Sequence, residues 1–361
     1  MVSQLLSAGS RAPAVVATVL AAAAVAVAPA PSAVPAPTTR ELVGQRLVVA
    51  LEGEHPSQAI LARIRRGEIG GVILFGANIT SPVQVRGLSA SLQEAARAAG
   101  RPPLLIATDQ EGGRVRRLPW AGPALAAPDL GALGTERIRD EARRAGLALR
   151  AAGIGVDLAP VADVPGPGSF MAAERRTFGV SAPAVGGAVA AFGRGLADAH
   201  VVAGVKHFPG IGAATRNTDR SAVVIGEPRS ALEGGWMPFR AAIAAGVPLV
   251  MISNASYPAL DAKPAPWSPR VQEILRRSLG FRGVTISDAL DAAAATRGRD
   301  VASVAVLSAQ AGVDLLLVTG SERTSARVFD RLARSADQGR IPAGSLRTSY
   351  DRILALKRDN P

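Results

Sequence analysis

The chain has 361 residues, of which 48% are hydrophobic, so it can bury a large core without disulfides or metals. It contains no cysteine, which excludes a thiol nucleophile, a cysteine-ligated metal and a disulfide framework. The net charge of +12 comes from basic residues that are scattered among acidic ones, and only 4% of residues are aromatic. This distribution argues against nucleic-acid binding and favours a solvated basic surface.

The N-terminus has the pattern of an export signal. Arg11 is the only charged side chain before Arg40, and the Ala/Val/Leu run at 14–28 between them is too short to cross a membrane comfortably. Small residues and prolines follow, as they do before a signal-peptidase cleavage site. We therefore expect residues 1–37 to be a signal peptide and a Pro/Ala-rich segment, with cleavage near 28–36. An uncleaved N-terminal anchor is the alternative, and both interpretations place the folded part outside the cytoplasm.

Short apolar runs alternate with longer Ala/Leu/Arg stretches over the rest of the chain, as in repeated β-α units around a parallel sheet. Eight such runs predict strands, at 47–51, 71–75, 104–109, 156–160, 205–208, 249–253, 284–288 and 313–318. Helices are expected between them, at 82–99, 135–152, 184–199, 230–245, 268–279 and 300–311. This order predicts an α/β fold, a single (β/α)8 TIM barrel over residues 38–361, with a doubly wound open sheet as the alternative.

In such a barrel, chemistry is located at the carboxyl ends of the strands. The third strand runs into Asp109 and the glycines of "DQEGG", which let the backbone bend sharply. We expect Asp109 to point into the barrel mouth and Arg114 and Arg117 to turn back toward it. A helix cap with a structural ion pair is the alternative.

Two later strands also end in polar residues. Lys206 and His207 end the fifth strand and precede a Pro/Gly loop, where they can donate hydrogen bonds to ligand hydroxyls; a structural histidine is the alternative. Asp288 is the first charged residue after the apolar seventh strand. A carboxylate held there suits the nucleophile of a glycosidase, whereas capping of the next helix is the alternative.

Together these segments resemble glycoside hydrolase family 3, in its branch of β-N-acetylglucosaminidases. The resemblance covers nearly the whole chain after the N-terminal segment. It rests on the motifs GGVILF, TDQEGGRV, LAPVADV, ERRTFG, KHFPG, YPALD and GFRGVTISD, in that order.

The resemblance implies roles for individual residues. Asp109 and Arg117 correspond to sugar-binding groups, as do Arg176, Lys206 and His207. Asp288 corresponds to the catalytic nucleophile. Neither a metal nor an organic cofactor is expected, because carboxylate catalysis of glycoside hydrolysis needs none.

One loop departs from the family pattern. In that branch KHFPG is followed by HGD and then by DSH, whose aspartate and histidine transfer protons. Here Ile211 and Ala213 replace the His and Asp of the first motif, and Asn217 and Asp219 replace the aspartate and histidine of the second. Asp219 is therefore the candidate acid/base. Ala289 also replaces the aspartate usual after the nucleophile.

The sequence therefore predicts an exported retaining β-glycosidase that removes terminal β-linked N-acetylglucosamine from peptidoglycan or chitin fragments. The alternatives are β-glucosidase-type specificity, a catalytically silent sugar-binding protein, and a basic scaffold of the cell wall. The expected partner is the carbohydrate substrate, bound by a monomer whose basic surface also favours contact with an anionic cell wall.

Overall fold

The computed structural model describes residues 9, 12–15, 17 and 36–359. The predicted signal peptide lies almost wholly outside the described residues. The chain divides into residues 1–36 and a larger, compact unit that contains residues 37–359. Within the part of the chain that is described, no helix has the length and apolar character needed to cross a bilayer.

Eight parallel strands form the centre of the larger unit. In sheet order they are β10 (Leu316–Val318), β1 (Leu47–Ala50), β2 (Gly71–Ile73), β3 (Leu105–Thr108), β6 (Val156–Asp157), β7 (Val202–Phe208), β8 (Leu249–Ile252) and β9 (Val284–Ser287). A parallel bridge between Ile286 and Leu315 joins the two outer strands. The sheet is therefore closed into the predicted barrel, and each of the eight predicted runs overlaps a strand, although β7 begins three residues before the predicted run at 205–208.

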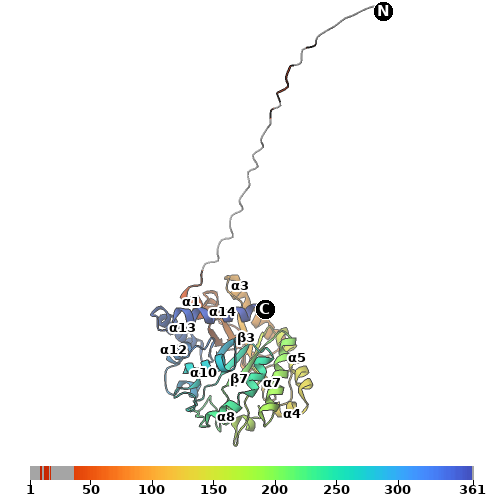
Figure 1. Ribbon diagram of the computed structural model, residues 1–361, viewed down its shortest axis with the longest axis vertical. Helices are drawn as coiled ribbons and strands as arrows, with labels where there is room; N and C mark the ends of the chain where they lie inside the picture. Colours follow the sequence, from red (N-terminus) through yellow and green to blue (C-terminus); the bar gives the residue numbers. More distant parts are fainter. Residues whose placement is uncertain (1–8, 10–11, 16, 18–35, 360–361) are drawn as a thin grey trace, which may run out of the picture. The chain divides into compact units, whose positions relative to one another are not determined.

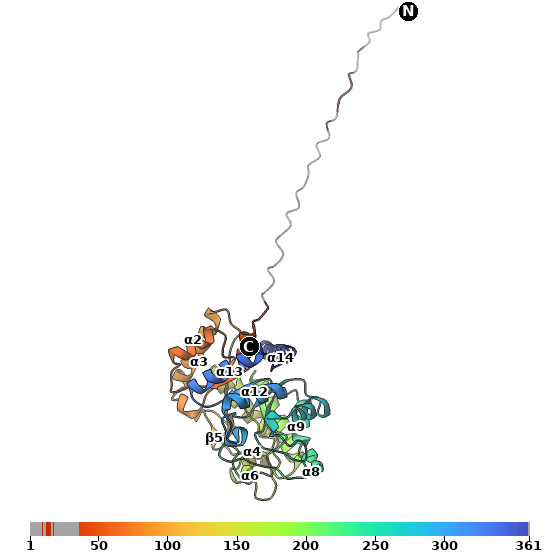
Figure 2. The same cartoon turned by 90° about the vertical axis from the view of Figure 1, so that its left-hand side faces the viewer.

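Helices surround the strands on all sides in Figure 1 and Figure 2. They are α1 (Thr39–Gly44), α2 (Gln58–Arg65), α3 (Pro82–Ala98), α4 (Ala127–Ala132), α5 (Thr135–Ala151), α6 (Phe170–Ala173), α7 (Ala182–Asp198), α8 (Arg229–Gly234), α9 (Met237–Ala244), α10 (Pro269–Glu273), α11 (Ala293–Thr296), α12 (Val301–Ala311), α13 (Glu322–Asp337) and α14 (Ala343–Asp359). Several begin at a serine whose hydroxyl accepts a backbone N–H of the first turn, as Ser81 does from Gln84.

Two of the predicted helices are interrupted. The helix expected at 230–245 divides into α8 and α9, because Gly235 follows α8 and Pro238, which has no backbone N–H, lies in the first turn of α9. The helix expected at 268–279 is α10 followed by a single π-helical turn at Ile274–Ser278.

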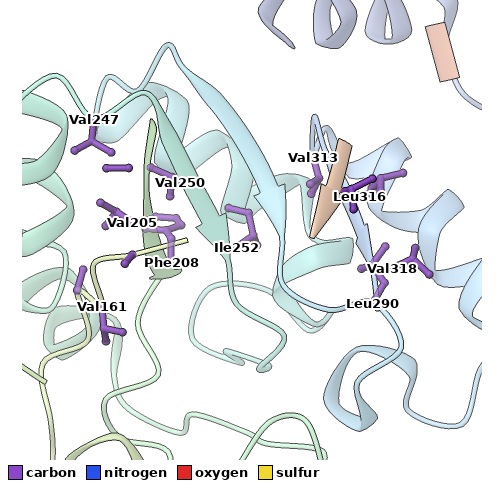
Figure 3. Packing of buried hydrophobic residues seen from close by; sticks show 14 of the residues in the cluster. Val161, Val205, Phe208, Val247, Val250, Ile252, Leu290, Val313, Leu316 and Val318 are labelled. Carbon is purple, nitrogen blue, oxygen red and sulfur yellow. The ribbon is translucent and has the colours of Figure 1, made fainter. Parts of the chain in front are cut away.

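The strands bury side chains on both faces. Alternate residues such as Val48, Ile73 and Leu105 fill the barrel interior, while their neighbours face the helices. Figure 3 shows part of this outer layer, including Val250 and Val318. Burial on both faces explains why the strands are continuous apolar runs in the sequence.

The C-terminal helix closes the amino-terminal end of the barrel. Ile353 of α14 joins the interior cluster, and the ammonium of Lys357 donates to Gln45 Oε1 at 2.7 Å and to the Gly70 carbonyl at 2.8 Å. Burial lowers the pKa of Lys357 to about 7. The carboxyl ends of the strands remain free to form a site.

Candidate active site

A cavity of about 450 Å3 lies at the carboxyl ends of the strands. Its apolar lining includes Ile73, Leu158, Met251 and Leu317, which belong to the barrel interior. Its polar lining includes all seven site residues predicted from the sequence: Asp109, Arg117, Arg176, Lys206, His207, Asp219 and Asp288. The fold thus brings together side chains from five separate segments of the chain.

Charged side chains form a buried cluster on one wall of this cavity. The ammonium of Lys206 lies 2.6 Å from Asp109 Oδ1 and 2.7 Å from Glu111 Oε1. The guanidinium of Arg176 donates to both carboxylate oxygens of Glu111, at 2.8 and 2.7 Å. Arg117 lies 3.9 Å from the second oxygen of Asp109. The cluster presents fixed donors and acceptors of the kind that bind sugar hydroxyls.

Three members of this cluster, Glu111, Lys206 and Arg176, keep their charges despite burial. Burial alone would raise the pKa of Glu111, but Arg176 and Lys206 hold it well below its usual range. Burial also opposes the charge on Lys206, yet Asp109 and Glu111 raise the pKa of its ammonium. The pKa of Arg176 is likewise raised by Glu111 against the effect of burial.

A two-stranded hairpin, β4 (Gln110–Gly112) and β5 (Val115–Arg116), positions Asp109 and Glu111. Gly112 and Gly113 have φ angles of +106° and +55°, and a Cβ on Gly112 would lie 2.7 Å from the Leu125 carbonyl oxygen. Arg117 returns to the cavity as predicted. The prediction for Arg114 is wrong, because its side chain is exposed and does not line the cavity. The two-residue turn directs it outward.

Asp157 lies behind the cluster at the end of β6. Its Oδ1 accepts the Gln110 N–H at 2.8 Å, and its Oδ2 has no partner among the described residues. Burial raises the pKa of Asp157 to about 8, so this carboxyl group is mostly protonated at neutral pH. It supports the hairpin without adding a third negative charge to the cluster.

His207 lies beside Lys206 and is paired with a buried carboxylate. Its Nδ1 is 2.8 Å from Asp163 Oδ2, and Asp163 Oδ1 accepts the Ile211 N–H at 2.7 Å. The pairing register of β7 with β8 shifts between Val205 and Phe208. Because such an irregularity breaks strict alternation, the adjacent Lys206 and His207 both line the cavity.

Asp288 follows β9 directly, and its Oδ1 accepts the N–H of Ala289 at 2.7 Å. Burial raises the pKa of Asp288, nearby His207 lowers it, and Asp219 raises it further. The next helix, α11, begins at Ala293 with Ala292 at its N-cap. Asp288 therefore does not cap that helix, and its carboxylate faces the cavity.

The loop at 211–220 carries the candidate acid/base. Asp219 is exposed and lines the cavity. The side-chain oxygen of Asn217 accepts a hydrogen bond from the backbone N–H of Asp219 at 2.7 Å. This hydrogen bond fixes the backbone of Asp219 and does not involve its carboxylate. Backbone N–H groups of Ala293 and Ala294 donate to the carbonyls of Asp219 and Thr218, at 3.0 and 3.1 Å. No ion pair joins Asp219 to the neighbouring Arg216 or Arg220 in the described residues.

The predicted set omits three residues that hold the site together: Glu111, Asp157 and Asp163. Glu111 and Asp163 lie within the motifs TDQEGGRV and LAPVADV, so the sequence could have identified them as site residues. Asp157 lies within an apolar strand run, where no motif indicates its role. Their partners are 65, 47 and 44 positions away in the sequence, respectively.

The mouth of the barrel holds buried groups that can hydrogen-bond to a sugar, and the carboxylate of Asp288 lines the same cavity at the end of a strand. This combination defines a carbohydrate-active hydrolase. The sequence model of the glycosyl hydrolase family 3 N terminal domain matches residues 38–356, and the chain belongs to this family.

Named relatives are similar over most of their length. A protein of Arthroderma benhamiae named "Uncharacterized secreted glycosyl hydrolase" is 35% identical over 327 residues, which cover 87% of this chain and 92% of the relative. A beta-hexosaminidase of Stenotrophomonas maltophilia is 34% identical over 310 residues, or 81% of this chain and 89% of the relative.

Among solved structures, the family 3 beta-N-acetylglucosaminidase from Paenibacillus sp. superposes with a TM-score of 0.87 at 35% identity. The match covers 90% of this chain and 63% of that one. The chain thus spans somewhat less than two thirds of the Paenibacillus protein.

Proposed function

We propose that this protein is a retaining β-N-acetylhexosaminidase that removes terminal β-linked N-acetylglucosamine. The observation that carries the proposal is the position of Asp288, which follows β9 directly, is half-buried and lines the same cavity as the cluster of Asp109, Glu111, Lys206 and Arg176. The names of the Stenotrophomonas and Paenibacillus relatives support the choice of sugar.

In this proposal Asp109, Arg117, Arg176, Lys206 and His207 hold the sugar. The carboxylate of Asp109 accepts hydrogen bonds from sugar hydroxyls, and the four cationic or imidazole groups donate them. Since these groups are already ordered by ion pairs and by Asp163, little side-chain freedom is lost when the sugar binds.

The reaction then takes two steps. A carboxylate oxygen of Asp288 attacks the anomeric carbon while the bond to the leaving oxygen breaks, and the carboxyl group of Asp219 gives that oxygen its proton. Next, Asp219 takes a proton from water, whose oxygen attacks the anomeric carbon and releases Asp288. Asp219 suits this role because it borders the cavity and its loop is fixed by Asn217 and α11.

The test is turnover of an aryl β-N-acetylglucosaminide, compared with the matching aryl β-glucoside. We expect the first to be hydrolysed faster, with retention of the β configuration. Faster hydrolysis of the glucoside would indicate β-glucosidase-type specificity instead. A product with inverted configuration would contradict the nucleophilic role of Asp288.

A second candidate is a sugar-binding protein without turnover. It is favoured by Asn217 and Asp219, which stand where the family branch carries its proton-transferring pair. Binding of N-acetylglucosamine by calorimetry without hydrolysis of any aryl glycoside would indicate this function.

We also propose that the protein is exported by a signal peptide within residues 1–37 and acts as a monomer on peptidoglycan or chitin fragments. The name of the Arthroderma relative includes the word secreted, which supports export. N-terminal sequencing of protein from the culture medium should begin at 29–37. An intact Met1 on membrane-bound material would indicate an anchor instead.

A further inference from the structure

A second cavity, of about 640 Å3, shares no lining residue with the candidate active site. It lies between the segment at 262–269 and the segment at 297–311. Its polar lining consists of Lys263, Trp267, Arg297, Arg299 and Gln310. A volume of this size accommodates a ligand as large as a disaccharide.

The charge of this cavity is unbalanced. Lys263, Arg297 and Arg299 are exposed cations that line it, and no acidic residue does. None of the three forms an ion pair with any described residue. Like charges that surround one hollow repel each other and attract anions.

The two nearest acidic residues along the chain are engaged elsewhere. The carboxylate of Asp261 accepts the Ser268 hydroxyl at 2.5 Å and the backbone N–H of Lys263 at 3.1 Å. Asp300 accepts a backbone N–H as the N-cap of α12 and pairs with Arg327 at 3.3 Å. An anion that enters the cavity therefore meets three cations that no carboxylate of the described residues neutralises.

The same cavity contains an aromatic ring. The guanidinium of Arg299 lies over the ring of Trp267, 5.4 Å from its centroid. The indole N–H of Trp267 is buried and has no acceptor among the described residues. An indole beside guanidinium groups offers an apolar surface for a sugar ring next to partners for its acidic substituent.

Helix α11 connects this cavity to the loop of Asp219. The first residues of α11 donate their N–H groups to the carbonyls of Asp219 and Thr218. Arg297 follows the other end of the helix in the left-handed conformation, at φ 46°, and donates to the Ser256 hydroxyl at 2.7 Å. One helical turn thus separates the second cavity from the rim of the active site.

We propose that this cavity is an accessory site for an acidic glycan, whose carboxylate binds Arg297, Arg299 and Lys263 while a sugar ring packs on Trp267. The choice of a glycan rests on the proposed function, because the single turn of α11 connects this cavity to the loop of Asp219, which lines the proposed site for sugars. Asp300, which occupies the N-terminus of α12 and follows Arg299 directly, repels a singly charged carboxylate less than a doubly charged phosphate, so a carboxylate fits better.

The test compares two double variants in an Asp288→Asn background, which prevents hydrolysis. Lys263→Glu with Arg299→Glu reverses the charge of the cavity. Arg65→Glu with Arg86→Glu changes two exposed arginines outside every described cavity by the same total charge. Binding is measured by calorimetry for a tetrasaccharide of alternating β-linked N-acetylglucosamine and glucuronic acid, and for neutral N-acetylchitotetraose.

We expect the first double variant to bind the acidic tetrasaccharide at least about tenfold more weakly, which corresponds to the loss of one charge-assisted contact or more. Binding of the neutral tetrasaccharide should not change, and the control should bind both like the parent. Equal losses in both double variants, or no loss in either, would overturn the proposal. Displacement of the acidic tetrasaccharide by millimolar inorganic phosphate would overturn the choice of a carboxylate.

This experiment is independent of catalysis. If the wild-type protein hydrolyses no aryl glycoside but the charge reversal still weakens binding of the acidic tetrasaccharide, the proposed function fails and the accessory site stands. If the wild-type protein hydrolyses an aryl glycoside but the charge reversal does not weaken binding, the proposed function stands and the accessory site fails.

Discussion

The ammonium of Lys206 lies 2.6 Å from the carboxylate of Asp109, although 97 positions separate the two residues in the sequence. The same ammonium lies 2.7 Å from Glu111. One cation on β7 therefore fixes both carboxylates that follow β3. Because the cluster is buried, removal of one member leaves an uncompensated charge, which costs more than the loss of a surface ion pair.

Glu111→Gln should test this cluster. We expect the free energy of unfolding in urea to fall by about 3–5 kcal/mol, the range found when one partner of a buried ion pair is removed. Affinity for N-acetylglucosamine should also fall, since Arg176 and Lys206 lose the carboxylate that orients them. Glu94→Gln, which breaks an exposed pair with Arg97 on α3, is the control and should change neither quantity. Wild-type values for Glu111→Gln in both measurements would contradict the prediction.

Asp288→Asn should abolish turnover and leave binding largely intact, because the amide keeps the shape of the nucleophile without its charge. We expect activity on the aryl β-N-acetylglucosaminide to fall below about a hundredth of wild type. Asp351→Asn, on the exposed face of α14, is the matched control. Residual activity above that level would show that another group attacks the anomeric carbon.

Asp219→Ala should slow only the substrate that needs protonation of its leaving group. For a sugar leaving group we expect a loss of about 10²–10⁴-fold in kcat/KM, the usual contribution of a general acid. For an activated aryl leaving group kcat/KM should be close to wild type. Equal rates of mutant and wild type on both substrates would eliminate the acid role.

The pH dependence should report the environment of Asp288. The nucleophile acts in its ionised form, and its pKa is raised, so the acid limb of kcat/KM should lie above the pKa of an ordinary aspartate. Asp219 raises this pKa and His207 lowers it. On the activated substrate, Asp219→Asn should therefore move the acid limb to lower pH, and His207→Gln should move it to higher pH. Shifts in the same direction would contradict the assignment of the limb to Asp288.

Lys357 should make stability depend on pH. Its pKa is about 7 in the folded protein and about 10.4 in an unfolded chain, so between pH 7 and 10 the unfolded chain binds more protons. This residue alone therefore makes the free energy of unfolding rise with pH, by about 3–4 kcal/mol over that window. Lys357→Met should remove this contribution, whereas Arg358→Met, at the exposed neighbour, should retain it. The measurement is urea unfolding of the three proteins at pH 7, 8.5 and 10. Parallel pH profiles of wild type and Lys357→Met would contradict the prediction.

The strands could be predicted because they are buried on both faces and lie in mainly apolar runs, although β6 and β7 include charged residues. The hairpin at 110–116 could not be predicted, because strands of two or three residues are too short to show a periodicity. The same holds for the outward turn of Arg114, which depends on the φ angles of Gly112 and Gly113.

The predicted site residues come from strand ends, where the barrel geometry itself brings them together. Glu111, Asp157 and Asp163, which hold the site together, could not be predicted in this way, because their role depends on partners that are far away in the sequence. Nothing in the apolar run around Asp157 indicates its role, which becomes visible only when its carboxyl group accepts the Gln110 N–H at 2.8 Å. Strict alternation would have placed Lys206 and His207 on opposite faces of β7, but the register of this strand shifts between Val205 and Phe208 and both residues line one cavity.

The pairing of β1 with β10 has a consequence for the order of events during synthesis. Leu47, Val48 and Val49 of β1 pair with Leu316, Leu317 and Val318 of β10. Lys357 of α14, which binds at the amino-terminal end of the barrel, comes still later in the chain. A ribosome must therefore deliver nearly the whole chain before the barrel can close. Until then β1 lacks one of its two neighbours, and the nascent protein exposes an unpaired strand edge for most of its translation.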